Sequence, residues 1–270
     1  MNNSNIEIPK PNNPDDLADV FIAFVEIVKL LREHCPWDRE QTNESISHLI
    51  IEEAYEALDA IQKKNDEEFS KELGDLLLHI VMHAIMAEER GAFNLIDVIN
   101  RISNKMVLRH PHVFGTVQVN GEEEVLENWE KIKKSEGRKN TLDGVPLSLP
   151  ALLRAERIQQ KASRVGFDWD NKQDVWKKVD EEFAELKREL FAGNQEKATE
   201  EFGDLLFALV NAARFEKIVP ESALQQTNSK FINRFRYVEE QARTSGRKLD
   251  EMTLEEMDEL WNEAKSKGIK

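Results

Sequence analysis

The spacing of apolar residues along the chain predicts helices. Between Leu17 and Leu31, apolar positions recur every three or four residues, as on one face of an α-helix. The stretches IEEAYEALDAI (51–61) and KELGDLLLHI (71–80) follow the same rule, and no stretch shows the sustained two-residue alternation of a strand. We therefore expect an all-α fold in which short loops, such as QKKND (62–66) and FAGNQ (191–195), join antiparallel helices.

The chain carries this pattern twice. IEEAYEALDAI recurs as VDEEFAELKREL (179–190), and KELGDLLLHI recurs as EEFGDLLFAL (200–209). The acidic positions keep one offset, because 182 minus 53, 185 minus 56, 201 minus 72 and 204 minus 75 all give 129. Flanking segments also match with small shifts, for example NKMVLRH with SKFINRF. The sequence therefore predicts a tandem repeat of two helical-bundle domains.

The domain limits follow from the repeat and from composition. Residues 1–16 are rich in Asn and Pro and predict a flexible tail. A first domain is expected at 17–136 and a second at 150–270, each of a usual domain size. Gly, Pro and polar residues cluster between them, which predicts a linker at 137–149.

Each copy places acidic side chains at helical spacing. Glu53 and Glu56 are three residues apart, as are Glu72 and Asp75, so two antiparallel helices could bring the pairs together. Charged groups are rarely buried unless they are paired or bind a metal. The alternative, a solvated acidic face, is disfavoured because the second copy keeps all four identities in register. Carboxylates without Cys or His suit Mg²⁺, with Mn²⁺ as the alternative. The candidate metal ligands are Glu182, Glu185, Glu201 and Asp204, and a second candidate metal site consists of Glu53, Glu56, Glu72 and Asp75.

Basic residues accompany the acidic pairs of the second copy. Lys178 and Lys197 lie just ahead of the two pairs, and Lys230 and Arg234 lie four apart on a later predicted helix. A cationic side chain beside a carboxylate-bound metal is the arrangement that a polyphosphate needs. Ion pairing on a helix surface is the alternative for each lysine.

Other reactive side chains are weaker candidates. His79 and His83 have the spacing of a zinc pair, but the second copy has Ala208 and Ala212 at those positions, so core or surface histidines are expected. Cys35 is the single cysteine of the chain, which excludes an intrachain disulfide. The second copy has a phenylalanine in its place, so Cys35 is not a credible nucleophile.

Charge and composition narrow the class of protein. The formal net charge of −15 argues against a large nucleic-acid footprint, which needs clustered Lys and Arg. The most apolar run is interrupted by Asp19, Glu26 and Lys29 and predicts no membrane span. The N-terminus does not resemble a signal peptide. These features predict a cytoplasmic globular protein that binds neither nucleic acid nor membrane.

The doubled pattern Glu-Glu-x-x-Glu with Glu-x-x-Asp, joined by GVPLSLPALLRAERIQQKASRVGFDW (144–169), resembles the two-domain bacterial MazG family of the all-α NTP pyrophosphatase superfamily. The resemblance implies Mg²⁺-dependent hydrolysis of nucleoside triphosphates to monophosphates and pyrophosphate, with broad base tolerance, by a homodimer. It implies catalytic roles for Glu181 and Lys197. The implied substrate contacts are Lys178, Glu181, Lys197, Lys230, Arg234 and Trp261.

The two copies differ in these implied substrate contacts. The first copy has Leu49 in place of Lys178 and Glu68 in place of Lys197. We therefore expect the main active site in the C-terminal domain. Two other functions stay open at this point: a helical regulatory or interaction protein that binds metal without turnover, and a narrower pyrophosphatase of the dUTP type.

Overall fold

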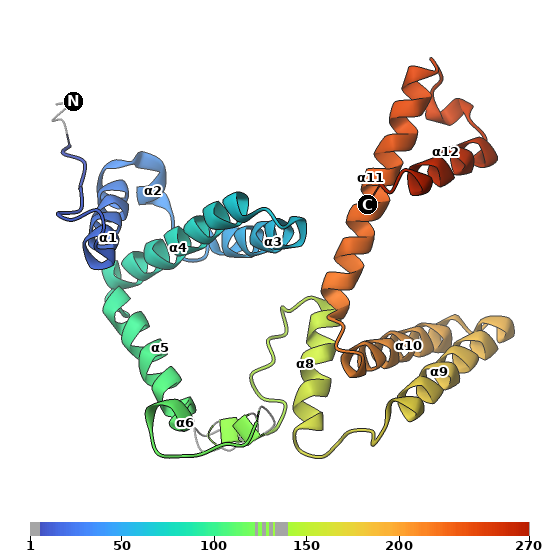
Figure 1. Ribbon diagram of the computed structural model, residues 1–270, viewed down its shortest axis with the longest axis horizontal. Coiled ribbons are helices and arrows are strands. Elements are labelled where there is room, and N and C mark those ends of the chain that lie inside the picture. Colours follow the sequence, from blue (N-terminus) through green and yellow to red (C-terminus); the bar gives the residue numbers. More distant parts are fainter. Residues whose placement is uncertain (1–5, 122–123, 126–127, 130–131, 133–139, 270) are drawn as a thin grey trace. The chain divides into compact units, whose positions relative to one another are not determined.

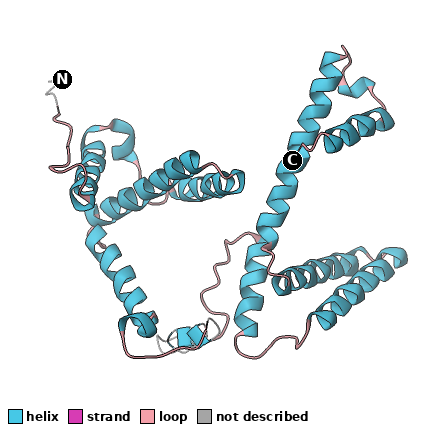
Figure 2. Cartoon of the chain, in the orientation of Figure 1, coloured by secondary structure: helices cyan, strands magenta, loops and turns pink. Residues whose placement is uncertain are grey.

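The computed structural model describes residues 6–121, 124–125, 128–129, 132 and 140–269. Helices and loops account for all of these residues, with no strand among them (Figure 2), so the all-α prediction is confirmed. The chain divides into two compact units, residues 1–120 and 121–270. The predicted domain boundary at 136–137 lies outside the described residues, and the predicted limits stay a prediction. No helix in the described ranges is long and apolar enough to cross a membrane.

The first unit is built on an acidic helical hairpin of α3 and α4 (Figure 1). Helix α1 packs against α4, and α5 follows α4. Its helices are α1 (Leu17–His34), α2 (Pro36–Glu40), α3 (Ser47–Lys63), α4 (Asp66–Glu89), α5 (Leu95–Arg109) and α6 (Pro111–Phe114). The apolar core lies between α1 and the second half of α4 and contains Val28, Ile46, Val81, Met82, Ile85 and Met86.

The second unit repeats the hairpin as α9 and α10, and α8 packs across α10. Helix α11 leads away from the hairpin, and Figure 1 shows α12 beside the part of α11 that is remote from α9 and α10. The helices are α8 (Ala151–Ser163), α9 (Lys172–Ala192), α10 (Gln195–Phe215), α11 (Pro220–Thr244), a 3₁₀ turn (Leu249–Glu251) and α12 (Leu254–Ser266). Val175, Val179, Ala208 and Ala212 form a core cluster between α9 and α10.

Both hairpins turn within two residues, at Lys64–Asn65 and at Gly193–Asn194. Each Asn side chain caps the following helix by accepting a backbone N–H from its first turn. Lys64 and Gly193 both adopt the left-handed conformation, with φ of 53° and 71°. A residue with a Cβ atom pays about 1–2 kcal/mol for that conformation, whereas glycine does not. The first hairpin therefore has the more strained turn.

Replacing Lys64 with glycine should stabilise the first unit. The relief of left-handed strain, about 1–2 kcal/mol, exceeds the extra entropy that glycine gives the unfolded chain, about 0.4–1 kcal/mol. Urea unfolding followed by circular dichroism should show a higher midpoint. Lys63→Gly, one residue earlier and inside α3, is the matched control and should lower the midpoint. A midpoint for Lys64→Gly at or below that of the parent would contradict the account.

Candidate active site

The antiparallel packing of α9 and α10 brings predicted metal ligands together. Glu182 on α9 and Glu201 and Asp204 on α10 each offer a carboxylate oxygen, and these oxygens all lie within 4.8 Å of one another. Glu182 is only 6% exposed, while Asp204 lies at the open rim. Glu185 forms a second group of three with Glu182 and Glu181, whose oxygens also lie within 4.8 Å of one another, and this group shares Glu182 with the first. All four predicted ligands of the second copy therefore lie in one acidic cluster.

Burial and mutual repulsion both make the ionised form of a carboxylate in this cluster less favourable. Desolvation raises the pKa of Glu201, and the carboxylates of Glu185, Glu182 and Asp204 raise it further. A divalent cation would relieve that repulsion. The donor set consists of carboxylate oxygens, which fits a hard cation such as Mg²⁺.

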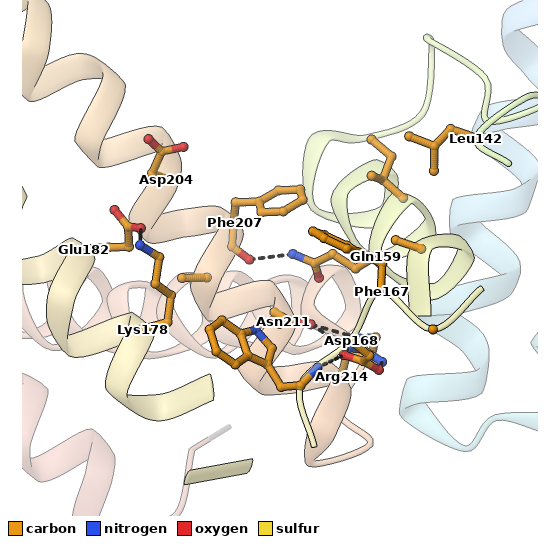
Figure 3. A pocket seen from close by; sticks show the side chains of 15 residues that line it. Leu142, Gln159, Phe167, Asp168, Lys178, Glu182, Asp204, Phe207, Asn211 and Arg214 are labelled. Carbon is orange, nitrogen blue, oxygen red and sulfur yellow. Dashed lines mark hydrogen bonds and ion pairs between the residues drawn. The ribbon is translucent and has the colours of Figure 1, made fainter. Parts of the chain in front are cut away.

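Lys178 lies at the edge of the acidic cluster, one turn before Glu182 on α9. Its Nζ donates to Glu181 Oε1 at 2.8 Å. The same Nζ lies 2.7 Å from Glu182 Oε1 (Figure 3). The hydrogen bonds with Glu181 and then Glu182 raise the pKa of Lys178, so the ammonium stays charged. The site thus holds a positive group within reach of any anion that approaches the cluster.

The first unit contains an equivalent group of three carboxylates. Glu53, Glu72 and Asp75 offer oxygens within 4.8 Å of one another, and Glu56 lies outside this group, as Glu185 lies outside the equivalent group of the second unit. Desolvation raises the pKa of Glu72, and Glu56 is the next cause. His79 is 8% exposed, and its Nε2 lies 3.8 Å from Glu53 Oε1. The histidine predicted as a core or surface residue is therefore buried against the acidic group.

The remaining predicted substrate contacts lie elsewhere in the second unit. Lys197 is exposed in the first turn of α10. Lys230 and Arg234 lie on α11 and Trp261 on α12. Arg234 donates its Nε–H to the Ile269 carbonyl at 2.9 Å, and its guanidinium lies 5.8 Å from the Trp261 ring centroid. The structure brings Arg234 and Trp261 together, and their predicted roles stay predictions.

A cavity of about 690 Å³ opens beside the acidic cluster (Figure 3). Lys178, Glu182 and Asp204 lie at one end, and α8, α10, the segment 166–169 and Leu142 form the rest of the wall. Arg214 on α10 ties that segment in place, with Nη1 2.9 Å from Asp168 Oδ2. Lys230, Arg234 and Trp261 are not among the residues that line this cavity.

The cavity also contains polar residues that the sequence predictions do not name, among them Gln159, Asn211 and Arg214. Arg214 Nη2 donates to Asn211 Oδ1 at 2.8 Å, one turn earlier on α10. None of the three belongs to the acidic pattern. Outside the acidic cluster and Lys178, the sequence signals this cavity through the segment GFDW at 166–169, which belongs to the stretch that carries the family resemblance.

Comparisons with known proteins agree with the repeat. Residues 41–114 and 171–238 match the MazG nucleotide pyrophosphohydrolase domain, and each match contains one acidic hairpin. The Thermotoga maritima nucleoside triphosphate pyrophosphohydrolase/pyrophosphatase MazG is 44% identical over 91% of this chain and 96% of its own length. The Escherichia coli nucleoside triphosphate pyrophosphohydrolase is 44% identical over 93% of this chain and 98% of its own. The uncharacterised Bacillus subtilis protein YabN is 48% identical over 98% of this chain and 56% of its own length. The chain therefore belongs to the MazG nucleotide pyrophosphohydrolase family.

Proposed function

We propose that the protein is a Mg²⁺-dependent pyrophosphohydrolase that converts nucleoside or deoxynucleoside triphosphates and water to monophosphates and pyrophosphate. The observation that carries this proposal is the acidic cluster of the second unit, with the Lys178 ammonium bound at its edge and a cavity alongside. Such a site offers oxygen ligands for a cation, a positive group for a phosphate and space for the rest of a nucleotide. Family membership supports the reaction class.

Each residue of the cluster has a proposed role. Glu182, Glu185, Glu201 and Asp204 would hold the cation. Bound Mg²⁺ would supply charge neutralisation at the phosphates and lower the pKa of a water molecule. Glu181 is exposed and hydrogen-bonds Lys178, so its carboxylate can orient that water or accept its proton. Lys178 would exchange its carboxylate partners for phosphate oxygens, and Lys197 adds a second positive charge.

The second unit is proposed as the main active site because it alone has lysine at both positions. Leu49 and Glu68 replace Lys178 and Lys197 in the first copy, so an anion there would meet an apolar side chain and a carboxylate. Lys230, Arg234 and Trp261 remain proposed nucleotide contacts, supplied from α11 and α12.

We also propose that the protein is a homodimer. The hairpin and α11 of the second unit leave large apolar rings exposed: Phe183 is 47%, Phe202 54% and Phe231 56% exposed. A second copy that packs on these rings would remove their apolar surface from water, which favours association. Sedimentation equilibrium measures the mass directly, and a monomer at micromolar concentration would contradict the proposal.

Product identification tests the proposed reaction. The purified protein is incubated with Mg²⁺ and a panel of NTPs, dNTPs and noncanonical triphosphates, and the products are separated by ion-exchange chromatography. Monophosphate and pyrophosphate in equal amounts, across several bases, are expected. Diphosphate and phosphate would contradict the proposed bond cleavage, turnover of dUTP alone would indicate the narrower enzyme, and no turnover would indicate a metal-binding protein.

Replacing Lys178 with leucine, the residue of the first copy, should weaken nucleotide binding. A hydrogen bond to a charged group contributes about 1.5–3 kcal/mol, which corresponds to a rise in KM of about 10- to 100-fold. Mg²⁺ binding, followed by calorimetry, should persist because every carboxylate remains. Lys177→Leu is the matched control, since Lys177 pairs only with Asp174 among the ion pairs of the described residues. An unchanged KM in Lys178→Leu would remove this lysine from the binding set.

A further inference from the structure

Helix α8 separates the cavity beside the acidic cluster from a second cavity of about 580 Å³. Ile158, Gln159 and Ala162 line the first cavity, and the opposite face of α8 lines the second. The segment that precedes α8 runs beside the helix (Figure 1) and contributes Pro146 and Leu149 to the second cavity. The described lining residues include none of the acidic cluster. A cavity of this volume suits a small organic molecule.

The second cavity is positively charged within an acidic protein. Arg157, Lys161 and Arg164 on α8 line it, although the formal net charge of the chain is −15. Lys161 also anchors the preceding segment, because its Nζ donates to the Asp143 carbonyl at 2.7 Å. A concave site lined by charges of one sign attracts ligands of the other sign. The cationic side chains therefore favour an anionic ligand.

One buried carboxyl group lines the same cavity. Glu156 is 8% exposed, and its Oε1 accepts from Gln160 Nε2 at 2.7 Å. Its Oε2 is buried and has no hydrogen-bond partner in the described part of the chain. Burial raises the pKa of Glu156, and the charge of Arg157 opposes this effect. A buried acceptor without a partner is unfavourable, so a ligand that brings N–H groups to Glu156 would be favoured.

The repeat indicates that the helix does not need a carboxyl group at this position. CPWD (35–38) and FDWD (167–170) match at an offset of 132, which makes Phe24 the equivalent of Glu156. Phe24 packs against the apolar core of the first unit. An apolar side chain therefore serves the fold at this position in one copy, whereas the other copy buries a carboxyl group beside a cavity.

The charges along α8 also limit the shape of the ligand. At 1.5 Å per residue, Lys161 and Arg164 lie about 7.5 and 12 Å further along the helix axis than Glu156. A compact anion cannot contact both ends of this series. The arrangement suits an elongated ligand with N–H donors at one end and a negative group at the other.

We propose that the second cavity binds a guanine nucleotide, with the base at Glu156 and the phosphate toward Lys161 and Arg164. Guanine carries two neighbouring donors, the ring N1–H and the 2-amino group, and an ionised carboxylate only accepts hydrogen bonds. Adenine and cytosine place an acceptor beside their amino group, and uracil places its N–H between two carbonyl groups, so a carboxylate would repel part of each edge. This second site goes beyond the proposed reaction and does not depend on it.

Two nucleotides that differ by one amino group test the role of Glu156. IMP is GMP without the 2-amino group, and isothermal titration calorimetry in EDTA measures both without a cation at the acidic cluster. The parent protein should bind GMP about tenfold more tightly than IMP, as expected for one hydrogen bond to a buried carboxylate. Glu156→Leu should lower this ratio to about one, and Glu156→Gln should also reduce it. The ratio compares two ligands on one protein and does not depend on the folded fraction.

Lys178→Leu is the matched control, because Lys178 lines the first cavity and not the second. The ratio should be unchanged in this variant. No preference for GMP in the parent, a full preference in Glu156→Leu, or its loss in Lys178→Leu would overturn the inference. A protein that binds GMP as expected but releases no pyrophosphate from triphosphates would contradict only the proposed reaction.

The other end of the ligand is tested by comparing GMP with guanosine. Lys161→Met should weaken GMP binding about tenfold, because a charged hydrogen bond to the phosphate is lost, and should leave guanosine binding unchanged. Lys161→Arg keeps the charge and should restore GMP binding. An equal loss for GMP and guanosine in Lys161→Met, without rescue by arginine, would contradict the placement of the phosphate.

Discussion

Replacing Glu182 with alanine should abolish pyrophosphate release, whereas replacing Glu53 with alanine should leave most of it. Glu182 is the most buried carboxylate of the second unit's cluster and belongs to both overlapping groups. Metal-assisted charge stabilisation contributes several kcal/mol, and each 1.36 kcal/mol corresponds to a factor of ten in rate. The loss in Glu182→Ala should therefore be about a thousandfold or more.

The comparison is informative because the two glutamates are equivalent in the repeat. Each belongs to a group of three carboxylates on a matching hairpin, so each substitution should damage one acidic group to a similar extent. Initial rates of pyrophosphate release are measured for both variants, with circular dichroism to verify helix content. Appreciable turnover in Glu182→Ala would refute the second unit as the main site, and an equal loss in both variants would indicate that the units act together.

Mg²⁺ should stabilise the folded protein, and a chelator should reverse the effect. Burial raises the pKa of Glu201 and of Glu72, and the neighbouring carboxylates raise both further, so their ionised forms are unfavourable without a cation. Binding to the native state at a hundred times the dissociation constant adds about 2.7 kcal/mol for each site. Scanning calorimetry should show a higher melting temperature with MgCl₂ and a smaller increase in Glu182→Ala.

Sodium chloride at matched ionic strength is the control, because salt screens repulsion without occupying a site. An equal rise with sodium chloride would mean that no specific cation site is present. A protein that binds metal without turnover would give the same melting data, so this measurement concerns the cation alone. Product identification decides between the enzyme and the binding protein.

Local sequence features predict the hairpins and the meeting of the acidic residues. Residues three or four apart on a helix share a face, and two-residue turns leave few ways to pair the helices. Helical spacing and the repeat are therefore enough to group Glu182, Glu201 and Asp204. The same local rules cannot decide the partner of the Lys178 ammonium. They allow it either to stay free for a phosphate or to form ion pairs with carboxylates. In the structure it is paired.

The cavity could not be predicted, because its parts are distant in the sequence and follow no period. Gln159 meets the Phe207 carbonyl across 48 residues, and one glutamine on a helix gives no sign of what it will face. The spacing of Lys230 and Arg234 likewise predicts a shared helix face but not its neighbours. Which helices pack against α8 and α11 is a tertiary outcome that depends on the whole apolar surface of the unit.

The two-residue turns make each acidic hairpin a self-contained cassette. All the carboxylates of one group lie on its two helices, and the turn sets their relative position. A chain that duplicates such a cassette copies the ion-binding geometry in one piece. The cavity draws on α8, outside the cassette, and is not inherited with it. Position 208 on α10 differs from position 79 on α4, while the four carboxylate positions keep their identities. Under the proposed function, this difference would let the second copy receive substrate while the first keeps the cation group.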